Sequence, residues 1–95
     1  MSDDRDPRSV LASMRASIDA VDHAIVNLLA ERRSLVSALL AYKHRAGLPL
    51  LDPAREEQLL AERAAFADAR GVPPELCARV FRAILDQSHD DAEHS

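Results

Sequence analysis

Apolar side chains recur at alternating steps of three and four residues along the first half of the chain. The series comprises Leu11, Met14, Ile18, Val21, Ile25, Leu28, Leu35, Leu39 and Tyr42. This spacing places them on one face of an α-helix, and its length is typical of a helix that packs lengthwise against other helices. Ser9 is a suitable N-cap, and Gly47 and Pro49 are typical of a helix end. The pattern therefore predicts one helix from about residue 9 to residue 45.

Two shorter helices are predicted in the second half of the chain. Asp52 followed by Pro53 is a typical helix start, with the aspartate as N-cap, and this helix should end near Gly71. A third helix should open at Pro74 and fray after Ser88. Three helices, one of them very long, predict an all-α fold.

The composition is consistent with one helical domain, since the 95 residues include only two glycines and few aromatic residues. Charged or acidic ends suggest a disordered tail at residues 1–8 and a mobile tail at residues 90–95. The helical domain is expected to cover residues 9–89.

The predicted first helix is too long for a monomer of this size. About 36 residues of helix span roughly 54 Å, whereas a compact chain of this length is roughly 32 Å across. The part of the apolar stripe that extends beyond the monomer must be covered, most simply by a second copy. We therefore predict an intertwined helical homodimer.

Charge and cysteine content narrow the class of protein. The formal net charge of −4 argues against nucleic acid as a partner. Cys77 is the single cysteine, which excludes an internal disulfide and is compatible with a reducing compartment. The sequence has no apolar leader or segment of membrane-spanning length, so we expect a cytoplasmic protein without a membrane partner.

Two cations lie on the apolar face of the long helix. Arg32 interrupts the stripe, and Lys43 follows eleven residues later on nearly the same face. A buried charge needs a partner, so this face could hold an anion inside a helical bundle. Alternatively, Arg32 is a structural arginine paired with Asp22 or Glu56, and Lys43 is a helix-end lysine favoured by the helix dipole.

Further charged residues could join this site. Asp52, Arg55 and Glu56 begin the second helix, where a short loop could fold them back toward the end of the first. Asp52 could equally be only a cap, with Arg55 and Glu56 in a solvated first turn. Arg15 lies roughly 25 Å from Arg32 along the helix, so it could share a small ligand only from the other protomer, and it could also be a surface arginine.

The remaining ionisable groups suggest no metal site. The histidines lack metal-ligand spacing and are expected to be solvated surface residues. They are His23, His44, His89 and His94. Cys77 is expected to be a small packed thiol.

Five segments together resemble the all-helical chorismate mutase family. They are residues 14–22, 28–33, 42–43, 51–56 and 84–88, within a resemblance that covers about residues 10–90. The resemblance implies an intertwined dimer of three-helix chains. It also implies an isomerase of the shikimate pathway, acting in aromatic amino acid biosynthesis, that converts chorismate to prephenate without a cofactor or a metal.

The resemblance assigns cationic residues to a dianionic substrate. It implies that Arg15 reaches in from the partner protomer and binds a substrate carboxylate. Arg32 would bind a carboxylate from the same protomer as the rest of the site. Lys43 would donate to the ether oxygen and to a carboxylate.

The resemblance also implies roles for residues of the second and third helices. Asp52 and Glu56 would hold the ring hydroxyl, Arg55 would support the charge network, and Ser88 would lie at a carboxylate. One position departs from the family pattern, because Ala92 stands where the family usually places a glutamine or glutamate that donates to the ether oxygen. Either the third helix shifts its register there, or the site lacks this donor.

Alternative functions remain open on the sequence. The substrate could be a relative of chorismate, such as 4-amino-4-deoxychorismate, or isochorismate, which would lose pyruvate in a lyase reaction. The chain could also be a weakly active or regulatory helical dimer that needs a partner enzyme of the aromatic pathway.

Overall fold

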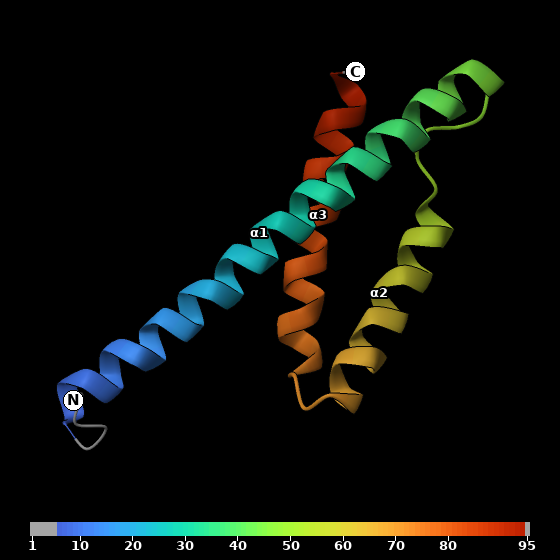
Figure 1. Ribbon diagram of the computed structural model, residues 1–95. Coiled ribbons are helices and arrows are strands. Elements are labelled where there is room, and N and C mark those ends of the chain that lie inside the picture. Colours follow the sequence, from blue (N-terminus) through green and yellow to red (C-terminus); the bar gives the residue numbers. More distant parts are fainter. Residues whose placement is uncertain (1–5, 95) are drawn as a thin grey trace. The chain divides into compact units, whose positions relative to one another are not determined.

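Three helices make up the computed structural model, which describes residues 6–94 (Figure 1). They are α1 (Pro7–Ala46), α2 (Pro53–Ala69) and α3 (Pro74–Glu93). The described residues contain no strand. The predicted all-α fold with one very long helix is confirmed. None of these helices, within the part of the chain described, is both long and apolar enough to cross a membrane.

The long helix begins at Pro7, two residues before the predicted cap Ser9. Asp6 caps it instead, because its Oδ1 accepts a hydrogen bond from the backbone N–H of Arg8 at 3.0 Å, and its carbonyl accepts one from Val10 at 3.0 Å. The prediction of Ser9 as N-cap was wrong, since aspartate followed by proline is the stronger start. Residues 1–5 of the predicted disordered tail lie outside the described residues.

Glycine ends both α1 and α2 at the predicted places. At Gly47, with φ of +68°, the N–H of Leu48 donates to the Lys43 carbonyl at 2.9 Å, and the Gly47 N–H donates to the His44 carbonyl at 3.3 Å. Gly71, with φ of +76°, repeats this arrangement at the end of α2. These pairs of bonds form Schellman motifs, whose left-handed residue is most easily glycine.

Residues up to Leu35 and residues from Val36 onward form two separate compact units, and α1 runs through both. In the first unit the apolar stripe is exposed, with Met14, Ile18 and Leu28 at 60%, 59% and 62% exposure. No residue of α1 is buried. Within this unit, the stripe that predicted packing along the helix is therefore exposed.

The second unit is built on α2 packed against α3, which runs antiparallel to it after a short turn (Figure 1). Its core consists of Leu59 and Ala67 from α2 and Leu85 from α3. The half-buried Cys77 adds a link, because its Sγ donates to the Arg63 carbonyl at 3.4 Å. Cys77 is thus a packed thiol, as predicted.

The third helix continues to Glu93, so most of the predicted tail after residue 89 is the last turn of α3. The N–H of His94 donates to the Asp90 carbonyl at 3.2 Å and closes this turn. Mobility of the tail stays a prediction, and Ser95 lies outside the described residues.

Candidate active site

Lys43 lies in the last turn of α1, next to the loop that leads to α2. Its side chain is half-buried, and its Nζ donates to the Leu50 carbonyl at 3.5 Å. The Schellman motif at Gly47 turns the chain back so that this contact can form. The ammonium group therefore lies beside Leu50, in the loop that leads to α2.

Asp52 is the N-cap of α2, as predicted from the sequence. Its Oδ1 accepts a hydrogen bond from the backbone N–H of Arg55 at 3.0 Å, and Pro53 occupies the first turn. The side chains of Asp52 and Arg55 are exposed. Capping accounts for one oxygen of Asp52 and leaves its other oxygen available to a ligand.

Glu56, in the first turn of α2, pairs with His89 on α3. The His89 Nε2 lies 2.7 Å from the Glu56 Oε2, and both residues are half-buried. The expectation that His89 is a solvated surface residue was wrong, because the packing of α3 on α2 brings its ring to this carboxylate. The two residues are 33 positions apart and leave no local signal, so a sequence pattern could not have found this pair.

Ser88 precedes His89 on α3 and is also half-buried. Its Oγ donates to the Ile84 carbonyl at 3.0 Å within the helix, which leaves the oxygen able to accept a further hydrogen bond. Ala92 is half-buried one turn later, on the same face of the helix as Ser88. Because α3 stays α-helical to Glu93, the register does not shift, and an alanine side chain occupies this position.

Arg15 and Arg32 belong to the first unit, on the helical segment that carries the exposed stripe. Arg15 is exposed and Arg32 is half-buried. Along one helix they lie roughly 25 Å apart. One copy of α1 therefore does not bring these two arginines together around a small ligand.

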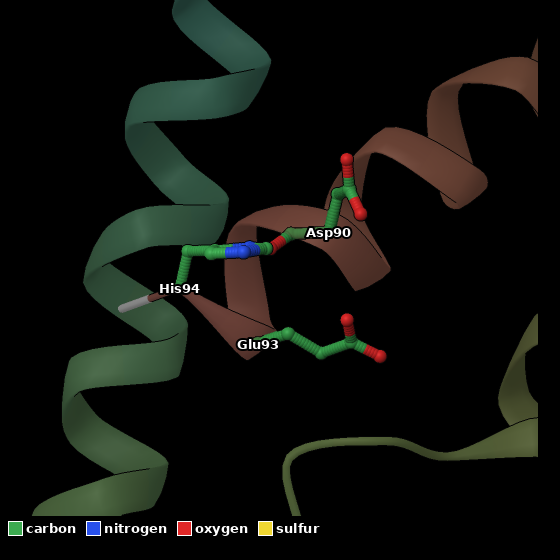
Figure 2. A group of neighbouring side chains, drawn as sticks. All are labelled: Asp90, Glu93 and His94. Carbon is green, nitrogen blue, oxygen red and sulfur yellow. The ribbon is translucent and has the colours of Figure 1, made fainter.

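A group of three ionisable side chains lies at the end of α3. Asp90, Glu93 and His94 are all exposed, and their potential ligand atoms lie within 4.8 Å of one another. Figure 2 shows the ring of His94 turned back toward Asp90, where its Nδ1 lies 2.8 Å from the backbone carbonyl oxygen. This hydrogen bond at the helix end accounts for the position of the ring without a metal ion.

Comparison with known proteins gives the family. A family model for chorismate mutase type II matches residues 14–91. The chain belongs to this family, which the sequence resemblance had predicted.

Three relatives illustrate the range of the match. The chain is 43% identical over 79 residues to a T-protein of Enterobacter agglomerans, a match that covers 83% of this chain but only 21% of that protein. It is 28% identical over 78 residues to a chorismate mutase of Methanocaldococcus jannaschii, covering 82% of this chain and 79% of that protein. It is also 26% identical over 78 residues to a 4-amino-4-deoxychorismate mutase of Streptomyces pristinaespiralis, covering 82% of this chain and 60% of that protein.

Proposed function

We propose that this chain catalyses the rearrangement of chorismate to prephenate. The observation that carries the proposal is the family match over residues 14–91, which includes every predicted substrate-binding position. These positions are Arg15, Arg32, Lys43, Asp52, Arg55, Glu56 and Ser88. The half-burial of Lys43, Glu56 and Ser88 within the second unit supports their use in a site rather than on a fully solvated surface.

The reaction is pericyclic: the ether C–O bond breaks while a C–C bond forms, and no proton is transferred. The protein must hold a flexible dianion in its reactive conformer, an orientation effect worth several kcal/mol. It must also stabilise the negative charge that develops on the ether oxygen, for which one preorganised donor is worth about 3 kcal/mol. Fixed cations can do both, so the proposal needs neither a cofactor nor a metal.

Each cationic residue binds a different group of the substrate. In this proposal Arg15 and Arg32 bind the two carboxylates, because the guanidinium fork matches a carboxylate and stays charged. Lys43 donates to the ether oxygen. Its contact with the Leu50 carbonyl at 3.5 Å is long and can give way to a substrate atom.

The residues of α2 and α3 complete the site. Asp52 and Glu56 accept the hydrogen bond of the ring hydroxyl, with Arg55 moderating their negative charge. Ser88 contacts a carboxylate. These assignments follow the family resemblance position by position.

The proposal includes a homodimer with two shared sites. Its support is the exposed apolar stripe of α1 in the first unit, where Ile18 and Leu28 remain 59% and 62% exposed. A second copy packed along this stripe would cover it, and would bring Arg15 of one protomer toward Arg32 of its partner. The single half-buried cysteine, Cys77, is compatible with the reducing conditions of the cytoplasm, where we place the protein.

The experiment that tests the activity is a direct assay on three substrates. The purified protein is incubated with chorismate, 4-amino-4-deoxychorismate and isochorismate, and each product is identified. Prephenate formed well above the uncatalysed rate is the expected result. Turnover of only one of the other substrates, or of none, would contradict the proposal.

Mixing two inactive variants tests the shared site. Arg15→Ala and Lys43→Ala each remove one cation, and we expect each variant alone to lose most activity. In a mixed dimer one of the two sites keeps both cations, so activity should return after subunit exchange. If exchange is confirmed and activity does not return, Arg15 does not act across the interface.

A second candidate function is a mutase that depends on a partner enzyme. The observation that favours it is Ala92, which offers no side-chain donor on the Ser88 face of α3. The chain spans 21% of the length of the T-protein it matches, so that relative carries the matching region within a much longer protein. A rise in turnover on mixing with enzymes that act next on prephenate would support this candidate.

A further inference from the structure

The His89–Glu56 hydrogen bond is the contact of the candidate site that neither the resemblance nor the relatives assign. Because an ionised carboxylate can only accept, the Nε2 of His89 is the donor and the Oε2 of Glu56 the acceptor, at 2.7 Å. The two side chains keep 38% and 26% exposure. Holding Glu56 from a second helix restricts its rotamer and leaves its Oε1 for another donor.

This restriction changes which donors Glu56 can satisfy. A ring hydroxyl offers one hydrogen and needs one acceptor oxygen, which Oε1 provides. A ring ammonium offers three hydrogens with a full positive charge, so it is best held by a carboxylate with both oxygens and its full charge available. His89 occupies one oxygen, and when the ring is protonated it also offsets the negative charge.

The neighbouring carboxylate is constrained in a similar way. The Oδ1 of Asp52 is committed to the backbone N–H of Arg55. Arg55 itself adds a positive charge in this first turn of α2. Each carboxylate therefore has one oxygen already engaged, an arrangement that suits a neutral donor better than a cation.

We propose that His89 is a positioning residue that acts through Glu56 and makes the site select a ring hydroxyl over a ring ammonium. This inference rests on the proposed function, because it takes the ring substituent of the substrate to lie at Glu56. His89 does not contact the reacting atoms and supplies no proton to the reaction.

The test compares two substrates across a set of variants. The kcat and KM values are measured for chorismate and for 4-amino-4-deoxychorismate in the wild type, His89→Leu and His89→Gln. Where the amino compound is not turned over, its inhibition constant against chorismate replaces its kcat/KM. His23→Leu makes the same substitution at an exposed site on α1 and serves as the matched control.

We expect His89→Leu to lower kcat/KM for chorismate about tenfold, mainly through KM, because a hydrogen bond that orients a binding group is lost. Selectivity should shift about tenfold toward the amino compound. His89→Gln keeps an N–H donor and should stay within about threefold of the wild type, as should the control. Adding His89→Leu to Glu56→Ala, which removes the acceptor, should cause no further loss, since His89 acts only through Glu56.

Several results would overturn the inference. One is an unchanged selectivity ratio in His89→Leu. Another is an equal loss on both substrates in His89→Leu and His89→Gln together with a lower melting temperature, which would indicate a structural role. A third is an additive loss in the double variant. If the wild type turns over chorismate, such results reject only the role of His89, whereas a wild type inactive on both compounds rejects the proposed function and this inference with it.

Discussion

The exposure of the stripe on α1 allows an estimate of how much one of its residues contributes to the free energy of the proposed dimerisation. Ile25 lies in the middle of this stripe and is 51% exposed. Full burial of an isoleucine is worth about 1.5–3 kcal/mol, so covering the exposed half contributes about 1 kcal/mol per protomer. A two-fold dimer contains the residue twice, so Ile25→Ala should cost about 2 kcal/mol of dimerisation free energy.

This loss can be measured as a change in the dimer dissociation constant. About 2 kcal/mol corresponds to roughly a thirtyfold weaker dimer, which sedimentation equilibrium over a range of concentrations resolves. At the same protein concentration the melting temperature should also be lower in the variant, because dimerisation stabilises the folded chain less. Asn27→Ala is the matched control, because two residues further along, at about 200° around the helix, it points away from the stripe.

Two results would refute this reasoning. One is a wild type that stays monomeric at every concentration, which would mean that the exposed stripe is not a dimer interface. The other is an Ile25→Ala variant whose dimer is as tight as that of Asn27→Ala. In that case any dimer would form through another surface.

Substitutions at three further positions test the roles of individual residues. Arg32→Ala should lower kcat/KM for chorismate about a hundredfold or more, because a charge-assisted carboxylate contact is lost, and steady-state kinetics that match the wild type would contradict this role. Ala92→Gln would add a donor one turn beyond Ser88 and should raise kcat by up to about a hundredfold, so an unchanged kcat would mean that the site does not lack this donor. Asp52→Ala removes the N-cap of α2 and should lower the free energy of unfolding by about 1 kcal/mol. This corresponds to a melting temperature lower by roughly 4–8 °C, which circular dichroism can follow. Asp52→Asn keeps a capping oxygen and should retain most of the stability.

The sequence by itself determined the helices and most of their ends. The caps and stops are local: Asp52 accepts from a backbone N–H three residues away, and Gly47 and Gly71 end helices through bonds that span a few residues. Such contacts are encoded by neighbouring residues, so they can be predicted without the fold. The one wrong cap, Ser9, was a choice between two nearby candidates, of which Asp6 preceded a proline.

The sequence also indicated the family, because the order and spacing of several short segments survive without any knowledge of packing. The match over residues 14–91 confirmed it. What the pattern could not indicate was how the site residues are held. Lys43 reaches the loop before α2 only because the chain turns back at Gly47.

Only the tertiary structure decided the partner of Glu56 and the surroundings of Ala92. His89 meets Glu56 across 33 residues because α3 packs antiparallel to α2, and no periodicity within either helix encodes that register. The helix could have frayed after Ser88, yet it continues to Glu93 and keeps Ala92 on the Ser88 face. Contacts between helices depend on how their side chains interlock, and that information lies in the pair of helices rather than in either stretch of sequence.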